Sequence, residues 1–300
     1  MSVLLRVAAA FLALWLLGPG GALAAGQKGK LRLATTTSTA DSGLLEAILP
    51  AFEAARGVKV DVVAVGTGQA LALGRAGDAD VLLVHARERE EAFLAAGHGT
   101  RRVDIMYNDF VIVGPKDDPA GIRGMGEAAA ALRRVAEAGL PFASRGDDSG
   151  THSKERSLWS RAGLAPTAAD RWFRSLGQGM GATLHYADET DAYTITDRGT
   201  FLAQRGSLPH LGVLVGGASI AANPDRALFN PYGLLLVSQE KSGVAATEAA
   251  AFAAWLASEP TQRQIAVFGR ATHGQPLFYP NSPAWQRAVA RAAAAGGSGG

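Results

Sequence analysis

The sequence predicts an α/β protein in which strands and helices alternate and parallel sheets are covered by helices. The chain has 300 residues, enough for about two domains. Hydrophobic residues make up 48% and charged residues 19% of the chain, which indicates a folded core. Apolar runs typical of strands also alternate with helical segments along most of its length.

Eight apolar runs are rich in β-branched residues, which favour strands. Strands are therefore expected at 30–36, 58–66, 79–85, 109–114, 141–144, 192–196, 211–216 and 232–238. The intervening segments have helical periodicity. One helical stripe runs from Leu44 to Phe52 and is closed by Gly57, and alanine-rich helices are expected at 126–138 and 247–258. The expected core residues of these two helices are Ala130, Leu132, Val135, Phe252, Trp255 and Leu256.

The first 25 residues have the pattern of a secretory signal peptide. Arg6 precedes the apolar run 7–17, and Ala22-Leu23-Ala24 follows with small residues at the cleavage positions. This run is shorter than the about 20 residues that span a bilayer, although an uncleaved anchor is the alternative. The chain has no cysteine, so disulfides, thiol chemistry and lipoprotein attachment are not expected. We expect a soluble periplasmic protein, with a flexible tail at 291–300.

The net charge of +2 and the absence of a basic run give no support to nucleic-acid binding.

Three of the expected strands end in loops that are rich in hydroxyl groups and lead directly into helices. These loops are TTTSTADSG (35–43), GTGQAL (66–71) and RGDDSGTHS (145–153). Ligands of parallel sheets bind beyond the carboxyl ends of the strands, and a helix N-terminus attracts anions. The alternative is that the hydroxyls only cap helices, as Ser38 would with Asp41 three residues later.

Arg145 strengthens the interpretation of these loops as an anion site. A guanidinium group beside a hydroxyl-rich helix start suits bidentate recognition of an oxyanion. The alternative role of Arg145 is a surface ion pair with Asp147 or Asp148.

These motifs resemble the periplasmic tungstate-binding proteins of ABC importers. The resemblance rests on 35–53, 63–90, 107–115, 144–155, 193–201 and 230–237, and the combination of TTTS with SRGDDSGTH is the most specific part. It implies a type II-like periplasmic binding protein fold with two lobes and two crossings, with the ligand in the cleft between them. On that pattern one lobe holds 27–113 plus 231–290, the other holds 114–230, and the crossings fall near Gly114-Pro115 and Asn230-Pro231.

The resemblance also implies a function and a set of ligand-binding residues. The protein would bind tungstate or molybdate and deliver it to a membrane permease, as a monomer without cofactor or catalytic activity. Arg145 and Thr151 match the family residues that contact the oxyanion. The full expected set is Thr36, Thr37, Ser38, Thr67, Gly68, Arg145, Ser149, Gly150 and Thr151.

The chemistry of the ligand sets an expectation for the two aspartates. Tungstate carries no proton at neutral pH, so its site needs donors only, whereas hydrogen phosphate needs one acceptor. Asp147 and Asp148 should therefore point away from tungstate, one of them orienting Arg145 or shaping the loop. Sulfate would be rejected by cavity size, while tungstate, molybdate and vanadate cannot be ranked from the residues.

Other interpretations of the same residues stay open, and one of them is a binding protein for phosphate, sulfate or vanadate. An exported hydrolase acting on a phosphorylated or acyl substrate would use Ser149 with His152, but no G-x-S-x-G elbow surrounds Ser149. A metal site would use Asp147, Asp148 and His152, and an adhesion signal would use the Arg-Gly-Asp tripeptide at 145–147. Further along the chain, Asp197 is expected to cap a helix, with Tyr193 or Arg198 as further ligand candidates. The remaining histidines, His85 among them, show no ligand spacing.

Overall fold

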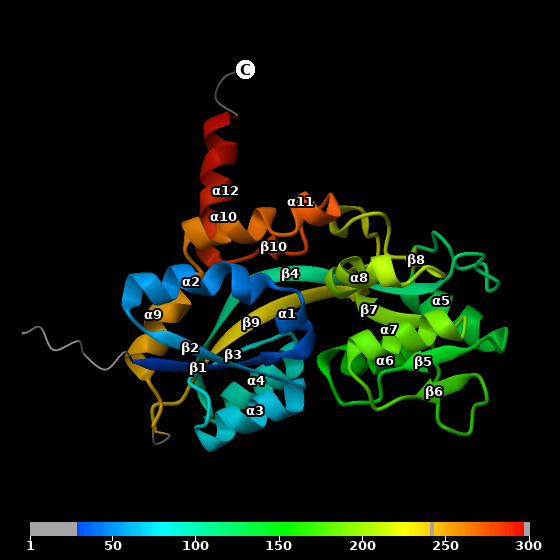
Figure 1. Cartoon of the computed structure of the whole chain (residues 1–300), viewed down its shortest axis with the longest axis horizontal. Helices are drawn as coiled ribbons and strands as arrows, with labels where there is room; N and C mark the ends of the chain where they lie inside the picture. Colours follow the sequence, from blue (N-terminus) through cyan, green and yellow to red (C-terminus); the bar gives the residue numbers. More distant parts are fainter. Residues whose placement is uncertain (1–28, 241–242, 297–300) are drawn as a thin grey trace, which may run out of the picture.

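One long strand joins the two lobes of the protein (Figure 1). The computed structural model describes residues 29–240 and 243–296, so the expected signal peptide lies outside the described residues. Strand β4 (Gly99–Pro115) pairs antiparallel with β9 (Phe229–Val237) from Gly99 to Asp109. From Phe110 onward it pairs instead with β7 (Thr194–Asp197) and β8 (Leu211–Val215). We call residues 29–109 and 230–296 lobe I, and residues 110–229 lobe II.

Lobe I contains a sheet with strand order β10-β4-β9-β3-β1-β2. Its remaining strands are β1 (Lys30–Thr36), β2 (Lys59–Val65), β3 (Val81–Val84) and β10 (Tyr279–Pro280). The sheet is flanked by α1 (Thr37–Asp41), α2 (Leu44–Arg56), α3 (Thr67–Ala76), α4 (Arg87–Ala95), α9 (Ala246–Leu256), α10 (Glu259–Val267) and α11 (Arg270–His273). The last helix, α12 (Pro283–Gly296), projects away from the lobe (Figure 1).

Lobe II places β7 and β8 against the second part of β4. A short parallel pair, β5 (Phe142–Ser144) and β6 (Phe173–Ser175), joins β7 through a bridge between Phe142 and Tyr193. Its helices are α5 (Ala128–Glu137), α6 (Gly150–Arg161), α7 (Met180–Glu189) and α8 (Arg198–Gln204), with short 3₁₀ turns at Arg205–Ser207, Ile220–Ala222 and Arg226–Leu228.

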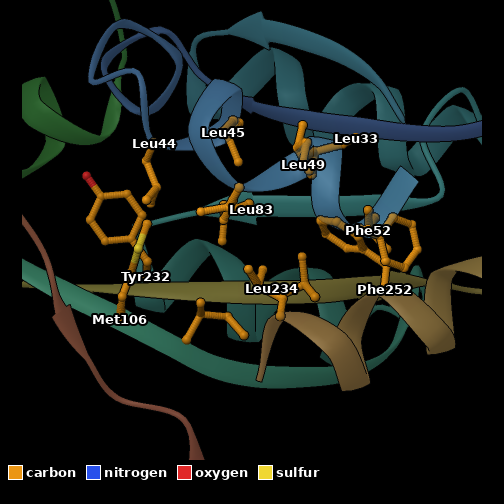
Figure 2. Close-up of a cluster of buried hydrophobic side chains, with 14 of the residues drawn as sticks. Leu33, Leu44, Leu45, Leu49, Phe52, Leu83, Met106, Tyr232, Leu234 and Phe252 are labelled. Carbon is orange, nitrogen blue, oxygen red and sulfur yellow. The ribbon is translucent and has the colours of Figure 1, made fainter. Parts of the chain in front are cut away.

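The core of lobe I lies between the sheet and its covering helices (Figure 2). The stripe predicted on α2 is buried, and Phe52 meets Phe252 of α9 edge to face with ring centroids 5.1 Å apart. Gly57 ends α2 in the left-handed region at φ 65°, as expected of a C-terminal glycine. Burying this apolar face fixes α2 on the sheet and so fixes the loop that precedes the helix.

The expectation of wholly parallel sheets is wrong for part of the molecule. β1 is parallel to β2 and β3, and β5 is parallel to β6, but β9 runs antiparallel to both β3 and β4. The reason is that β4 leaves lobe I and β9 enters it, so the two strands run in opposite directions.

The structure also tests three local predictions, which concern two helix caps and the C-terminal tail. Asp197 caps α8 as expected, accepting the Thr200 N–H at 2.9 Å. Thr36, not Ser38, caps α1, because the Thr36 hydroxyl accepts the Thr39 N–H. Residues 291–296, expected to belong to a flexible tail, continue α12 because their alanines favour a helix; residues 297–300 lie outside the described residues.

The lobe boundaries implied by the resemblance stay a prediction. The two expected crossings can be compared with the positions at which β9 begins and β4 changes its partners. β9 begins at Phe229, beside the expected crossing at Asn230-Pro231. β4 changes its partners between Asp109 and Phe110, before the expected Gly114-Pro115 step, because the strand continues as far as Pro115, which pairs with Leu211. None of the helices in the described ranges combines the length and apolar character that a membrane crossing requires.

Candidate functional site

The carboxyl ends of three strands of lobe I lie at one edge of its sheet, because β1, β2 and β3 are parallel. The chain leaves these strands at Thr36, Gly66 and His85 and in each case enters a helix close by. Two of these strand ends belong to the loops singled out in the sequence. The third places His85 beside them.

The first loop is held by hydrogen bonds around the Thr36 hydroxyl. Its oxygen lies 2.6 Å from the Thr39 hydroxyl, 3.2 Å from the Ser38 hydroxyl and 3.3 Å from His85 Nε2. Ser38 is buried, whereas Thr37 is half-buried and lines the cleft between the lobes. The loop is thus held by its own hydrogen bonds, and Thr37 faces the cleft.

The second loop starts α3 and carries an unpaired donor. Thr67 is fully buried, and its hydroxyl has no hydrogen-bond partner among the described residues. A buried hydroxyl group without a partner is costly, so its position calls for a ligand or water. Gly66 and Gly68, on either side of it, line the cleft. A Cβ at Gly68 would lie 2.8 Å from the Arg89 guanidinium, so a side chain there would displace the end of Arg89.

In lobe II the third loop places Arg145 at the end of β5. The Arg145 side chain is 3% exposed. It forms an ion pair with Asp147 and donates to the Thr151 hydroxyl at 3.4 Å. Its Nε has no partner among the described residues, so this guanidinium group retains a buried donor.

The same loop begins α6, whose N-terminus faces lobe I. Ser149 caps the helix by accepting the His152 N–H at 3.2 Å, and its own N–H donates to Asp147 at 3.2 Å. A Cβ added to Gly150 would lie 2.9 Å from His85 Cε1 and 3.3 Å from the Thr67 hydroxyl. The lobes are therefore in contact here, and the start of α6 adjoins the first two loops.

The two aspartates of this loop have separate partners. Asp147 orients Arg145 and accepts a loop N–H, as the sequence analysis expected of one carboxylate. Asp148 pairs with Arg89 of lobe I at 3.3 Å, and Arg89 also donates to the Asp148 carbonyl at 3.2 Å. Asp148 holds φ at 54°, a left-handed conformation that aspartate tolerates better than most residues. This arginine–aspartate contact links the lobes across the cleft.

All nine residues predicted for the site lie around this junction. Thr37, Gly68 and Arg145 line one cleft, and Thr67 lies beside Gly150. Thr36 and Ser38 adjoin through their hydroxyls, Ser149 caps α6, and Thr151 contacts Arg145. Their contact with a ligand stays a prediction.

Burial dominates the electrostatics of the ionisable groups around the junction. It lowers the pKa of His85 to about 4, so this imidazole is neutral near pH 7. Burial raises the pKa of Glu155 to about 7, although the Ser144 hydroxyl and the Arg145 N–H beside it act in the opposite direction. It also raises the pKa of Asp197, which two Thr200 donors and the Arg145 charge partly offset.

The arrangement of Ser149 and His152 differs from that of a nucleophile and its base. Nδ1 of His152 accepts the Asp148 N–H at 3.0 Å, and the Ser149 hydroxyl is engaged by the His152 backbone. Among residues 29–240 and 243–296, no group of three or more His, Asp or Glu side chains is placed to hold a metal ion.

The two further ligand candidates have structural partners instead. Arg198 forms a buried bidentate pair with Asp109 at 2.6 and 2.8 Å, beside the point where β4 changes its partners. The Tyr193 hydroxyl accepts the Ala120 N–H at 2.8 Å and donates to Asp118 at 3.2 Å.

Sequence reasoning missed three contributors to this region. They are His85, Arg89 and the loop 177–179, whose Gln178 N–H donates to the Arg145 carbonyl at 3.1 Å and which lines the cleft. His85 was identifiable in principle, because it directly follows a strand parallel to β1. The other two gave no signal, since their role depends on the contact between lobes.

Comparisons with known proteins agree with this architecture. A family model described as a PBP superfamily domain matches residues 21–260. The tungstate-binding protein TupA of Peptoclostridium acidaminophilum is 46% identical over 85% of this chain and 87% of its own. The protein of the same name from Campylobacter jejuni is 37% identical over 77% of this chain and 84% of its own.

Two solved structures are similar over nearly their whole length. One is described as the tungstate ABC transporter from Geobacter sulfurreducens, with 48% identity, a TM-score of 0.71 and coverage of 80% of this chain and 98% of that one. The other is the tungstate-binding protein TupA from Desulfovibrio alaskensis, with 43% identity, a TM-score of 0.71 and coverage of 85% and 99%.

Proposed function

This chain belongs to the PBP superfamily and, within it, to the family that includes the tungstate-binding protein TupA, and from that premise we propose that it captures tungstate or molybdate. It acts as the substrate-binding component of an ABC importer. The oxyanion binds between the lobes, against the loops at 36–38, 66–68 and 145–151.

The observation that carries this proposal is a pair of unsatisfied donors at the lobe junction. The Thr67 hydroxyl in lobe I and Arg145 Nε in lobe II are both buried and both without a partner among the described residues. The start of the twelve-residue helix α6 lies between them and adds a partial positive charge. An acceptor-only ligand supplies what all these groups lack.

The positions of Asp147 and Asp148 support a fully deprotonated ligand. Asp147 is engaged by Arg145 and the Ser149 N–H, and Asp148 by Arg89. Both aspartates line the cleft, but their carboxylates are already paired with arginines and do not need a protonated anion as a donor, which favours tungstate or molybdate over hydrogen phosphate. Sulfate is smaller and would leave some donors unpaired in a cage sized for the larger ions.

The remaining steps of transport follow from the same proposal. A signal peptide at the N-terminus directs the protein to the periplasm, where it works as a monomer and carries out no reaction on its ligand. The closed arrangement of the two lobes around the anion is the form that docks to the membrane permease.

Calorimetric titration of the mature protein with tungstate, molybdate, vanadate, sulfate and phosphate tests the proposal. We expect binding of tungstate or molybdate and no binding of sulfate or phosphate at comparable concentrations. Arg145→Ala should weaken tungstate binding about tenfold to a hundredfold, the range that 1.5–3 kcal/mol for a charge-assisted hydrogen bond implies. Arg174→Ala, which removes an exposed arginine of the same lobe, is the matched control and should bind normally.

The proposal fails if none of the five anions gives measurable heat and none raises the melting temperature. Preferential binding of phosphate would move the assignment to another anion, and turnover of a phosphate or acyl ester would identify a hydrolase.

A further inference from the structure

His85 occupies a central position at the junction of the lobes. The imidazole is buried and stacks on Tyr232 with centroids 4.6 Å apart. Both of its nitrogens have partners: Nδ1 lies 3.0 Å from Asn230 Oδ1, and Nε2 lies 3.3 Å from the Thr36 hydroxyl. Gly150 of lobe II closes over the ring. His85 thus touches the first anion loop, a crossing strand and the opposite lobe.

A chain of hydrogen bonds fixes which nitrogen carries the proton. It starts at the Asp197 carboxylate, which accepts a hydrogen bond from the Asn108 amide N–H at 3.4 Å. The same carboxylate accepts two further hydrogen bonds from Thr200. The Asn108 oxygen is thereby directed to Asn230, whose Nδ2 donates to it at 2.7 Å. The Asn230 oxygen then faces His85, so Nδ1 must donate. Since the imidazole is neutral, its Nε2 is an acceptor.

The direction of this chain decides the role of Thr36. The Thr36 hydroxyl can donate one hydrogen bond, and it donates this bond to His85 Nε2. Its oxygen accepts from Thr39, whose hydroxyl is 2.6 Å away and whose N–H is 3.4 Å away. Thr36 therefore has no donor left for an anion. The Ser38 hydroxyl, 3.2 Å from Thr36, keeps its proton for another acceptor.

We propose that His85 is a positioning residue for oxyanion binding. By accepting a hydrogen bond from the Thr36 hydroxyl, it fixes the first loop so that Ser38, and not Thr36, donates to the anion. This assignment rests on the proposed function, and it changes the expected role of Thr36 from ligand contact to support.

The same chain connects the site to both crossings between the lobes. Asn108 and Asn230 face each other as partners in the β4–β9 ladder, one just before the first crossing and one just after the second. Asp197 belongs to lobe II and the Thr36 loop to lobe I. The charged groups that face His85 are Arg145 and Lys154, both from lobe II, and their charges also disfavour a protonated ring. The chain of hydrogen bonds therefore links the first loop to the segment where the two lobes join.

Calorimetry on a small set of variants tests the role of His85. His85→Phe keeps a ring and removes both hydrogen bonds, and Thr36→Val removes the hydroxyl. Each should weaken tungstate binding about threefold to tenfold, as loss of one neutral hydrogen bond implies. The double variant should lose less affinity than the sum of the two single losses, because the Thr36–His85 hydrogen bond is absent from both single variants. His85→Gln offers an acceptor near the position of Nε2 and should recover most of the affinity. His185→Phe, at an exposed position on α7, is the matched control.

A second measurement does not depend on how the variants fold. Nitrogen-15 NMR of the wild-type imidazoles reports the tautomer directly, and His85 should carry its proton on Nδ1 with and without tungstate. A proton on Nε2 overturns the assignment, as does full affinity in His85→Phe or an additive loss in the double variant. If the wild type binds tungstate and one of these results is found, only the role of His85 is lost. If the wild type binds no oxyanion, the proposed function and this role fall together.

Discussion

At the scale of single residues, the lobe junction contains buried donors that lack a partner. Thr67 Oγ1 and Arg145 Nε are two of the buried side-chain atoms without one among the described residues. Such atoms cost free energy and call for an explanation. The Ser144 hydroxyl and one Glu155 carboxyl oxygen also lack a partner, as do atoms elsewhere in the fold, so it is their position at the junction that singles out Thr67 and Arg145.

The buried Glu155 carboxyl predicts a pH-dependent stability. Burial raises its pKa from 4.5 to about 7, so the folded state favours the protonated form. The contribution of protonated Glu155 to the free energy of unfolding is complete below about pH 4.5, and it is lost as the pH rises through 7. Glu155→Gln, which cannot ionise, should therefore gain stability relative to the wild type between pH 5 and 8, on the order of 3 kcal/mol.

Urea unfolding of both proteins across this pH range measures the difference. His85, whose pKa burial lowers to about 4, makes stability fall as the pH drops from 6.5 toward 4, but it is present in both proteins and cancels. Glu189→Gln, at an exposed site on α7, should show no such trend. A constant difference between Glu155→Gln and the wild type would contradict the prediction.

At the scale of secondary structure, the start of α6 is the element that brings the lobes together. It can approach His85 and Thr67 because Gly150 has no side chain. The contact across the cleft is completed by Arg89 and Asp148, a pair whose exposure limits its contribution to at most about 1 kcal/mol. We therefore expect close packing at the helix start to contribute more to closure than this ion pair.

Gly150→Ala should weaken tungstate binding without unfolding the protein. The added methyl group would lie 2.9 Å from His85 Cε1 and 3.1 Å from Nδ1, so the lobes could not close fully. Overpacking of this kind costs about 1–3 kcal/mol, and the affinity should fall about tenfold or more. The backbone of Gly150 is not left-handed, so alanine is tolerated in the helix itself.

Calorimetry and thermal denaturation separate these two effects. Gly206→Ala is the control, because a Cβ at that position meets no atom within 4 Å and its backbone is not left-handed either. Tight binding by Gly150→Ala would show that the lobes need not close as far as this structure indicates.

At the scale of the whole molecule, the first crossing is secured by a buried ion pair. Asp109 is the last residue of β4 that pairs with β9, and its carboxylate is bound by Arg198 and by Asn223 at 2.7 Å, both from lobe II. Arg198 also donates to the Gly216 and Gly217 carbonyls at 2.6 and 2.9 Å. One guanidinium group thus joins the crossing to the interior of lobe II.

Arg198→Ala should destabilise the protein by about 3–5 kcal/mol, because it leaves Asp109 buried without its counter-charge. Removing both charges with Asp109→Asn and Arg198→Met should cost less than Arg198→Ala alone, for the same reason. Chemical denaturation measures both variants, with the exposed Arg226→Ala as the control. Equal stability of Arg198→Ala and the wild type would show that the pair is not needed.

Much of the fold was predictable because apolar runs directly report buried strands and helices. All eight expected strand segments correspond to observed strands, and the α2 stripe and its glycine stop were confirmed. The first half of β4 was missed because it carries charged residues. Arg102 is nearly buried there through an ion pair with Glu90 at 2.6 Å, a partner on α4 that no local pattern reveals.

The site shows the same limit. The hydroxyl loops and Arg145 could be identified because their residue types alone suit an anion. The sequence predicted that one of Asp147 and Asp148 would orient Arg145. It could not identify Arg89 as the partner of Asp148, because Arg89 approaches from the other lobe. His85 was overlooked because an isolated histidine carries no spacing signal, and its importance comes from the network around it.

β4 crosses the lobe boundary as a single strand, and this bears on how the cleft opens. Its 17 residues form ladders on both sides of the boundary, although the register shifts between Ile112 and Val113 and at two points in the ladder with β9. The connection there is a strand and not a loop, and strands in sheets are twisted about their long axes by variable amounts. We therefore expect opening to be mainly a torsion of one lobe against the other.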